Sequence, residues 1–261
     1  MPEAHSFVSP SIDLNADLGE YAVPGDPSSD RELLEIVTSA NIACGAHAGN
    51  EAVMREVIAM AAARGVAIGA HPGYPDAQGF GRRELGLTPE EILTEVTSQI
   101  GIMLDACAAQ HVTLVHVKPH GALYNRAVVD ADAADAIAEA IRAADDRLIL
   151  VGLADSELLR AGQAASLRVA SEAFADRAYL ANGTLAPRDL AGSVLSNDKE
   201  VADRAERMVT DRTVTALDGT VVPIEVDTIC VHGDNPHAVA LALAVRRRLE
   251  ESGIRIAPLA R

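Results

Sequence analysis

The chain is predicted to fold as a parallel α/β barrel of the TIM-barrel type, with seven strands in a (β/α)7 arrangement. Seven short apolar segments alternate with helix-like segments, which favours parallel pairing through right-handed crossovers. Six of the seven segments end in polar residues. Parallel strands bring their C-terminal ends to one face, so these residues are expected to converge on one pocket, as in an enzyme. An open doubly wound sheet is the alternative fold.

The elements follow one another in a regular order after a short N-terminal tail. The expected strands cover residues 11–15, 41–44, 66–70, 112–117, 148–151, 167–170 and 228–231. The expected helices cover residues 29–36, 51–64, 88–110, 132–144, 156–164, 199–209 and 235–251. The second helix carries its apolar residues on one face, and Gly65 stops it. The third opens with a capping box between Thr88 and Glu91, with Pro89 at its first position.

One region, at about residues 188–224, interrupts this alternation. It contains one of the expected helices, followed by a hairpin over 214–222 that turns at Asp218-Gly219, a dipeptide typical of tight hairpins. The sequence shows no internal repeat and no linker, and its length is ordinary for a single barrel. We therefore expect residues 1–261 to form one domain with a helix-plus-hairpin insertion.

Charge and composition argue against several classes of function. The formal net charge of −16 repels phosphate backbones and anionic lipid, so neither a nucleic acid nor a membrane is an expected partner. The N-terminus shows no signal peptide, and no apolar run approaches the roughly 18 residues that a membrane span needs. The three cysteines include no Cys-x-x-Cys pair and cannot form a closed set of disulfides. We expect a cytoplasmic protein.

Two histidines, His47 and His71, directly follow apolar strands in matching Gly-Ala-His contexts. Asp17 follows the first strand in the segment Asn-Ala-Asp-Leu-Gly-Glu. An aspartate with two histidines on neighbouring strand ends is typical of a divalent-metal site with open positions for water. Two alternatives stay open: the histidines donate to loop carbonyls, and Asp17 caps a turn or orients one of the rings.

The densest polar cluster is the segment Lys-Pro-His-Gly-Ala-Leu-Tyr-Asn, which begins at Lys118 and includes His120. Lys118 is one of only two lysines in the chain. At the mouth of the barrel it is expected to fix a substrate carboxylate or to stabilise a developing oxyanion. A salt bridge to Glu172 or Asp234 is an equal alternative and does not exclude that role. Glu172 is also a candidate general base, provided that partial burial raises its pKa.

Further residues are expected to bind the substrate. Arg82 and Arg188 lie in loops of the same face and could hold an anion, although loop arginines are usually solvated. The other expected contacts are Asn15, Tyr124, Asn125, His232 and Asp234. No segment matches the P-loop pattern, so the chain shows no recognisable nucleotide site.

Taken together, these segments resemble the LamB/YcsF family. The resemblance covers nearly the whole chain in order and rests on residues 12–20, 41–49, 69–74 with 79–82, 116–125, 172–179 with 187–188, and 231–234. Two departures are visible. Ala46 and Asn50 stand where the family often has phenylalanine and aspartate.

The resemblance implies the cleavage of 5-oxo-L-proline to L-glutamate, driven by ATP hydrolysis, in a 5-oxoprolinase complex of three different subunits. This chain would be the first of the three, and the 5-oxoprolinase subunits B and C would handle the ATP. The family also resembles, more distantly, metal-dependent carbohydrate deacetylases, so a barrel of the glycoside hydrolase/deacetylase type is expected. Some deacetylases begin with Asn-Ala-Asp-Asp, and this chain has Leu18 at the last of these positions.

In a lactam-hydrolysing complex, the aspartate and the two strand-end histidines would activate or position water. Lys118 and His120 would bind substrate and steady the oxyanion, and Glu172 would shuttle protons. One alternative is a free-standing metal-dependent deacetylase that acts on an acylated sugar. A second is a substrate-binding subunit whose pocket is not catalytic. ATP-dependent turnover would distinguish the lactam-hydrolysing complex from the deacetylase. Pocket variants that assemble but do not turn over would distinguish it from the non-catalytic subunit.

Overall fold

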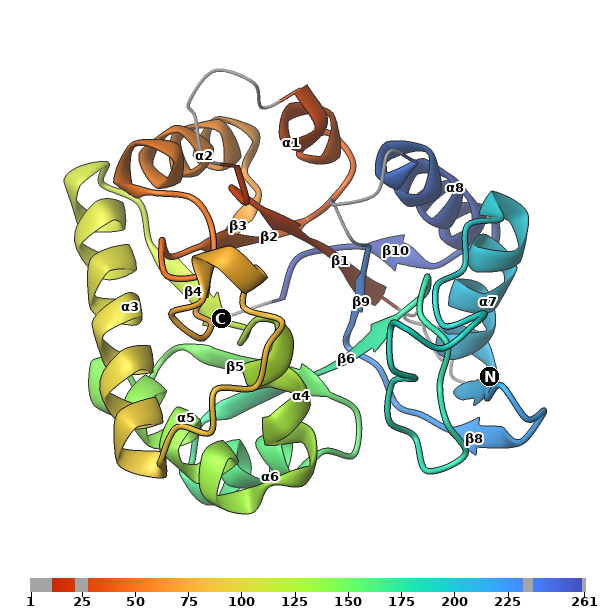
Figure 1. Ribbon diagram of the computed structural model, residues 1–261. Coiled ribbons are helices and arrows are strands. Elements are labelled where there is room, and N and C mark those ends of the chain that lie inside the picture. Colours follow the sequence, from red (N-terminus) through yellow and green to blue (C-terminus); the bar gives the residue numbers. More distant parts are fainter. Residues whose placement is uncertain (1–10, 22–27, 232–236, 260–261) are drawn as a thin grey trace, which may run out of the picture.

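Seven parallel strands form a closed barrel in the computed structural model, which describes residues 11–21, 28–231 and 237–259 (Figure 1). Their order is β1-β2-β3-β4-β5-β6-β9, and β9 pairs back onto β1 to close the ring. The strands are β1 (Ser11–Leu18), β2 (Ser39–Ala43), β3 (Ala67–His71), β4 (Leu114–Val117), β5 (Ile149–Leu153), β6 (Arg168–Phe174) and β9 (Thr228–Cys230). The predicted seven-stranded barrel is confirmed, and the open sheet is wrong.

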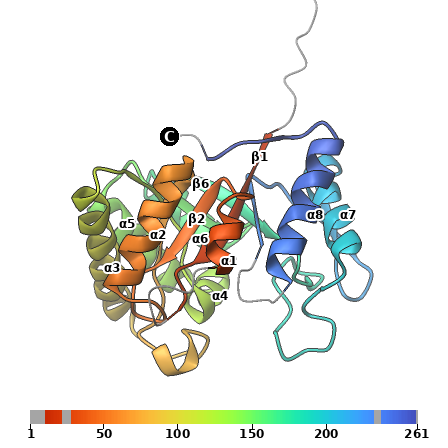
Figure 2. The same cartoon turned by 90° about the horizontal axis from the view of Figure 1, so that it is seen from above.

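Helices surround the ring of strands (Figure 1). They are α1 (Ser28–Leu33), α2 (Glu51–Arg64), α3 (Pro89–Ala109), α4 (Gly121–Val129), α5 (Ala131–Ala144), α6 (Glu157–Ala164), α7 (Asp198–Thr210) and α8 (Ala238–Glu251), with a short 3-10 helix at Ala77–Gly79. In the view from above, α7 and α8 pack together on one side of the barrel, and α3 packs on α5 on the other (Figure 2). The sequence did not predict α4 as a helix.

The local signals at the helix ends operate as expected. The Asn50 side chain accepts a hydrogen bond from the backbone of Val53 and caps α2. Gly65 ends this helix with φ of 69°, a left-handed conformation that favours glycine. Both hydrogen bonds of the capping box between Thr88 and Glu91 are present at the start of α3. These caps fix where the helices begin and end around the barrel.

Strand β1 shows how the barrel separates a polar interior from an apolar exterior. Leu14 and Leu18 belong to the main hydrophobic core between strands and helices. Asp13, Asn15 and Asp17 alternate with them and are also buried, and they bond to residues of other strands across the interior. The inner layers of this barrel are therefore polar near the carboxyl ends of the strands.

Helix α3 is the one helix in the described part of the chain that is long and apolar enough to cross a membrane by length and composition. No such segment was expected from the sequence. Its apolar side chains, Ile92, Val96, Ile100 and Met103 among them, are buried against the rest of the barrel. We interpret α3 as a core helix of the fold.

One hairpin and one further short strand lie outside the ring of seven strands. The hairpin of β7 (Thr213–Thr215) and β8 (Val221–Pro223) is antiparallel and follows α7, as the sequence predicted. That the whole of 188–224 is an insertion stays a prediction. Strand β10 (Arg255–Ile256) pairs in parallel with the first two residues of β1. The three cysteines, Cys44, Cys107 and Cys230, are buried and free.

Candidate active site

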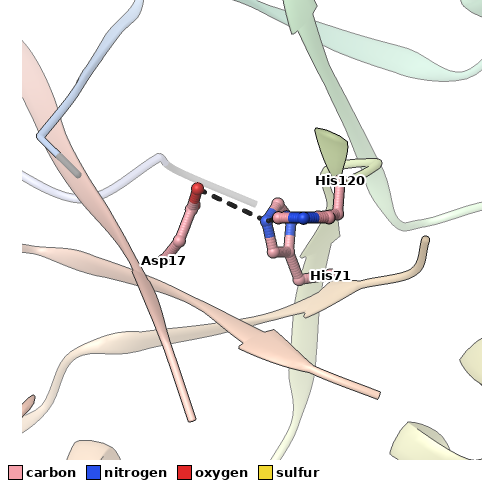
Figure 3. Close-up of side chains that lie close together, drawn as sticks. All are labelled: Asp17, His71 and His120. Atoms are coloured by element: carbon pink, nitrogen blue, oxygen red, sulfur yellow. Dashed lines mark hydrogen bonds and ion pairs between the residues drawn. The ribbon is translucent and has the colours of Figure 1, made fainter. Parts of the chain in front are cut away.

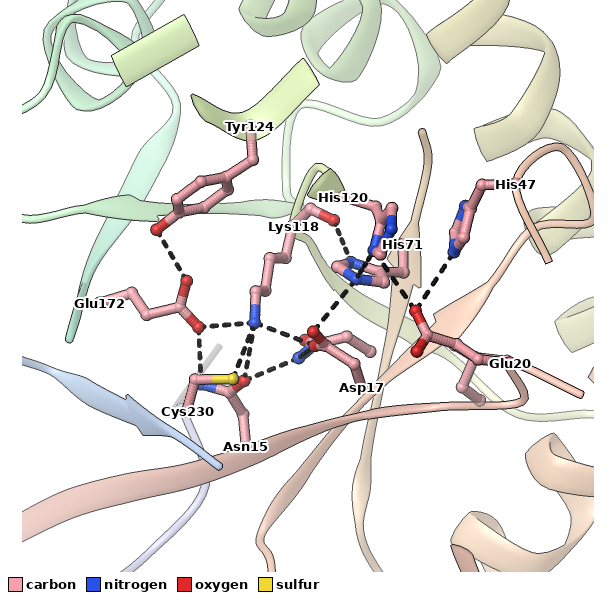
Figure 4. Close-up of polar contacts among 12 residues, drawn as sticks. Asn15, Asp17, Glu20, His47, His71, Lys118, His120, Tyr124, Glu172 and Cys230 are labelled. Carbon is pink, nitrogen blue, oxygen red and sulfur yellow. Dashed lines mark hydrogen bonds and ion pairs between the residues drawn. The ribbon is translucent and has the colours of Figure 1, made fainter. Parts of the chain in front are cut away.

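Polar side chains from separate strands meet at the carboxyl end of the barrel (Figure 4). Asp17 comes from β1, His71 from β3, Glu172 from β6 and Cys230 from β9, and Lys118 directly follows β4. All are buried. The convergence that the strand pattern predicted is therefore present in the structure, whereas the chemical roles of these residues stay proposals.

Lys118 lies at the centre of this group and is only 2% exposed. Its Nζ is 2.9 Å from Asp17 Oδ1, 2.8 Å from Glu172 Oε1 and 3.1 Å from Cys230 Sγ, with Asn15 Oδ1 at 3.3 Å. An ammonium has three N–H donors, and these acceptors can take all three. Burial opposes the charge, but attraction to Asp17, Cys230 and Glu172 outweighs it and raises the pKa of Lys118 well above its usual value.

The salt bridge between Lys118 and Glu172, one of the two alternatives for the lysine, is thus present in the structure. Asp234, its other expected partner, lies outside the described residues, as does His232. Glu172 also accepts a hydrogen bond of 2.8 Å from the Tyr124 hydroxyl. Since its carboxylate is fully buried among these donors, Glu172 belongs to the framework that holds the lysine.

Two histidines beside this group have fixed tautomers. His71 Nδ1 lies 2.7 Å from the carbonyl oxygen of Lys118, and His120 Nε2 lies 2.9 Å from that of Phe80. A carbonyl oxygen only accepts, so each of these nitrogens carries a hydrogen. His71 Nε2 and His120 Nδ1 are then left to face each other at 3.0 Å (Figure 3).

Two carboxylates face the same two nitrogens. Asp17 Oδ2 is 3.3 Å from His71 Nε2, and Glu20 Oε1 is 3.3 Å from His120 Nδ1. With both rings neutral, four acceptor atoms would point at one another, so the cluster requires a proton or a cation between them. Burial alone would lower the pKa of His71, but Asp17 outweighs burial and raises it. Burial, together with the charge on His71, lowers the pKa of His120.

A divalent cation would fit this donor set, because imidazole nitrogens and carboxylate oxygens suit such ions and both rings already have the required tautomer. Among the described residues, two groups have ligand atoms close enough to share an ion: Asp17 with His71 and His120, and Glu20 with His47 and His120. The grouping differs from the expected one, in which His47 joined Asp17 and His71. His120 is common to both groups.

His47 occupies a position behind His120. The two rings stack in parallel with centroids 3.8 Å apart, and His47 Nε2 is 3.3 Å from Glu20 Oε1. Its Nδ1 is buried and has no hydrogen-bond partner. Desolvation by burial lowers the pKa of His47 despite the nearby glutamate. His47 therefore supports the ring of His120 and the carboxylate of Glu20.

A cavity of about 580 Å³ opens in front of the cluster. Five of its lining residues belong to the cluster itself: Asp17, Glu20, His71, Lys118 and His120. Its wall also contains most of the expected substrate contacts, namely Arg82, Tyr124, Asn125 and Arg188. The expected site residues Asn15, His47 and Glu172 are not among the described residues that line it, and they lie behind the wall.

Two charged residues of this cavity, Glu20 and Arg177, were not expected from the sequence to have a role. Glu20 ends the polar segment that begins at Asn15. This position, just after the first strand, is the feature of the sequence from which its place in the site could have been predicted. Arg177 is 5% exposed, and its guanidinium donates to the carbonyl oxygens of Ala186 and Ser193. Burial, followed by repulsion from Arg188, lowers the pKa of Arg177 to about 10. Its charge is therefore held in the cavity wall beside those of other arginines.

The whole folded region has known counterparts. Residues 12–261 match the model of the LamB/YcsF family. The chain belongs to the LamB/YcsF family. A relative from Methylococcus capsulatus, named as the A component of 5-oxoprolinase, is 53% identical over 249 residues, which are 95% of this chain and 96% of the relative. A relative of the same name from Coprothermobacter proteolyticus is 51% identical over 248 residues, which are 95% of this chain and 95% of the relative.

Solved structures of this family and of more distant proteins have the same fold. The crystal structure of a lactam utilization protein from Thermus thermophilus is 46% identical, with a TM-score of 0.88 over 95% of this chain and 100% of its own. The catalytic domain of a peptidoglycan N-acetylglucosamine deacetylase from Eubacterium rectale is 11% identical, with a TM-score of 0.53 over 100% of this chain and 93% of its own. The second likeness concerns the fold alone, and it agrees with the deacetylase-type barrel that the sequence predicted.

Proposed function

We propose that this LamB/YcsF protein is the A component of a 5-oxoprolinase and takes part in the hydrolysis of the lactam of 5-oxo-L-proline to L-glutamate. The identity of about half of all residues with proteins of that name supports this function. The observation in the structure that carries it is a buried acid–histidine–lysine cluster at the inner end of a cavity whose wall also contains three arginines. Such a cavity offers proton transfer at one end and an anion site at the other.

The arginines Arg82, Arg177 and Arg188 bind the carboxylate of the substrate in this proposal. Arginine forms bidentate hydrogen bonds with carboxylates, and a chain of net charge −16 needs local cations to attract an anion. Lys118 is less suited to this task, because its three N–H groups face acceptors of the protein. Tyr124 and Asn125 line the same wall and orient the ring of the substrate.

The inner cluster performs the proton transfers. Asp17 orients the ring of His71 and favours its charged form. His71 Nε2 can therefore take a proton from the water that attacks the lactam carbonyl and give it to the ring nitrogen as the C–N bond breaks, so that this nitrogen becomes the amino group of glutamate. Lys118 balances the charges of Asp17 and Glu172 and keeps both carboxylates in place. Glu172 acts from behind, through Lys118 and Tyr124. The shuttle role that the sequence suggested for Glu172 thus becomes a role in positioning.

A divalent cation, where one is bound, would be held by Asp17, His71 and His120, with Glu20 beside them. Such an ion supplies Lewis-acid chemistry, by polarising a carbonyl group or acidifying water. The identity of the ion is left open in this proposal.

The partners follow from the energetics of the reaction. Opening an unstrained five-membered lactam in water is unfavourable and requires coupling to ATP. The sequence contains no P-loop pattern, so we assign the ATP to the partner subunits B and C. The relatives are named as one component of a 5-oxoprolinase, which implies a complex of this kind. We place the complex in the cytoplasm.

The decisive experiment is an assay of glutamate release from 5-oxoproline by the purified complex of this chain with its co-expressed partner subunits. We expect release with ATP and none without it. Deacetylation of an acylated sugar by this chain alone, without ATP, would instead favour a carbohydrate deacetylase. Full turnover in a complex that carries His71→Ala would make the chain a non-catalytic subunit.

A further inference from the structure

His116 is a fully buried histidine to which the proposed mechanism gives no role. It lies on β4, two residues before Lys118, so its side chain points into the barrel one layer below the lysine. It is not among the described residues that line the cavity. Its Nε2 is 2.8 Å from Asn41 Oδ1, whereas its Nδ1 has no hydrogen-bond partner.

The hydrogen bonds of Asn41 show where the proton of His116 lies. The amide nitrogen of Asn41 is 2.7 Å from Asn15 Oδ1 and 2.8 Å from Asp17 Oδ1, so both of its hydrogens are donated to oxygen atoms. The amide oxygen therefore faces His116 and requires a donor there, which is Nε2–H. Burial, followed by the charge of Lys118, lowers the pKa of His116 to about 3, so the ring is neutral and has this one N–H.

The opposite orientation of the Asn41 amide would be unfavourable. It would turn Oδ1 toward the carboxylate of Asp17 and the side-chain oxygen of Asn15, placing acceptors against acceptors. The N–H of His116 satisfies the amide oxygen in the one orientation that Asp17 and Asn15 allow. In that orientation Asn41 and Lys118 both donate to Asp17 Oδ1, and Asp17 Oδ2 faces His71.

The backbone is arranged to allow this contact. Asp17, Asn41, Gly69 and His116 are register partners in one row across β1, β2, β3 and β4. A Cβ atom at Gly69 would lie 2.0 Å from His116 Nε2. Because the third position of the row is glycine, the imidazole ring can cross β3 and reach Asn41 on the far side.

We propose that His116 is a positioning residue that acts through Asn41 to hold Asp17 in the geometry in which it orients His71. We call the chain of contacts His116–Asn41–Asp17 the relay. This inference rests on the proposed function for its link to turnover, while the relay itself is a property of the fold.

The test compares His116→Met, which removes the donor, with His116→Gln, which can still donate to Asn41. Both are assayed as the complete complex. We expect about a tenfold loss of kcat for His116→Met, since a hydrogen bond that orients a charged group is lost, with KM nearly unchanged because the arginines are untouched. His116→Gln should retain most of kcat. Normal kcat in His116→Met, or equal losses in both variants, would overturn the proposal.

A double-mutant cycle distinguishes the relay from a general packing effect. If His116 acts only through Asn41, adding His116→Met to Asn41→Ala should cause no further loss of kcat. Losses that multiply would show that the two residues act independently and would overturn the relay.

Crystal structures separate a failure of the relay from a failure of the proposed function. In His116→Met the Asn41 amide oxygen loses its donor, so the Asn41 side chain should shift and Asp17 should move away from His71. This result is expected even where the wild-type complex releases no glutamate and the proposed function has therefore failed. An unchanged Asp17 overturns the relay. If His116→Met does not fold, the structure and the activity of His116→Gln provide the test. A fully active His116→Gln whose glutamine amide makes no contact with Asn41 would also overturn the relay.

Discussion

The Lys118 side chain balances two buried carboxylates, and this arrangement sets what its replacement would do. Asp17 and Glu172 are 8% and 0% exposed, and each lies within 3 Å of the ammonium. Removing one member of a buried ion pair leaves an uncompensated charge, which is usually far more costly than the pair is stabilising. The lysine therefore affects stability and catalysis together.

We predict that Lys118→Met lowers the free energy of unfolding by about 3 kcal/mol and abolishes glutamate release by the complex. The chain offers a matched control, because its only other lysine, Lys199, lies on α7 with a side chain that is 85% exposed. Lys199→Met should change neither quantity. Chemical denaturation and the release assay measure both effects. A Lys118→Met variant that is stable but inactive would contradict the structural role and would indicate that Lys118 contacts the substrate.

The depressed pKa of His116 predicts a dependence of stability on pH. The unfolded chain takes up a proton on this residue below about 6.5, whereas the folded chain resists it down to about 3, so stability contributed by the neutral ring is lost as the pH falls. In His116→Gln, the free energy of unfolding should fall less steeply over this range, by up to about 1.4 kcal/mol per pH unit.

Urea denaturation at several pH values checks this difference. His111→Gln, at an exposed position, is the control and should follow the wild type. Parallel curves for His116→Gln and the wild type would contradict the prediction.

The proton and a divalent cation compete for the same lone pairs of His71 and His120. Cation binding should therefore strengthen as the pH rises, and it should be lost in His120→Ala, since His120 belongs to both candidate groups. Calorimetric titration of the chain with Zn²⁺ measures this, with His111→Ala as the control. Affinity that is independent of pH, or retained in His120→Ala, would argue against a site in this cluster.

Which single residues the sequence could predict depended on how directly the strand pattern placed them. Asp17, His71 and Lys118 end apolar strands, so their convergence was predictable. The salt bridge between Lys118 and Glu172 was one of the expected alternatives. The contacts of the lysine with Asp17 and Cys230 were not predicted, because they depend on β1 and β9 meeting across the ring. Arg177 was given no role, since only the fold shows that its guanidinium is buried in the cavity wall.

At the scale of the elements, Gly121 joins the start of α4 to the loop that covers the histidines. It has φ of 57°, and a Cβ atom there would lie 2.5 Å from the carbonyl oxygen of Gly81. Gly81 in turn approaches His47 and His120 closely enough that a side chain would collide with them. These two glycines allow the loop to press against the stacked rings.

We predict that Gly121→Ala lowers the melting temperature and the activity, because it combines a left-handed conformation with a collision against backbone. Gly101→Ala, within α3 where an added Cβ meets no atom within 4 Å, should instead stabilise the protein by roughly 0.5–1 kcal/mol. Thermal unfolding of the two variants measures the expected decrease in stability for Gly121→Ala and the expected increase for Gly101→Ala. A stabilised, fully active Gly121→Ala would contradict the role given to this turn.

The elements themselves were predictable where local signals are strong, as in α2 and α3, which have caps at their expected ends. Strands β1 and β6 run further than expected, to Leu18 and Phe174. Each strand was expected to end where polar residues begin, but the interior of this barrel accepts polar side chains, so strand pairing continues past that point. Helix α4 was missed because its segment was interpreted only as a cluster of site residues.

At the scale of the whole molecule, the chain supplies a pocket without an evident means of using ATP. We predict that the purified chain alone releases little or no glutamate from 5-oxoproline and that adding the partner subunits restores release. The same assay, with ATP present throughout, measures both conditions. Robust ATP-dependent release by the isolated chain would contradict the division of labour within the complex.

The pairing of β10 with the start of β1 has a consequence for engineering the protein. Ser11 and Arg255 are register partners, so the first described residue lies beside a residue that is four positions before the last described one. They meet about 20 Å along β1 from Asp17, at the amino end of the barrel and away from the cavity. A short peptide could therefore join these ends in a circular permutant, and a domain fused at either of them would leave the entrance to the cavity unobstructed.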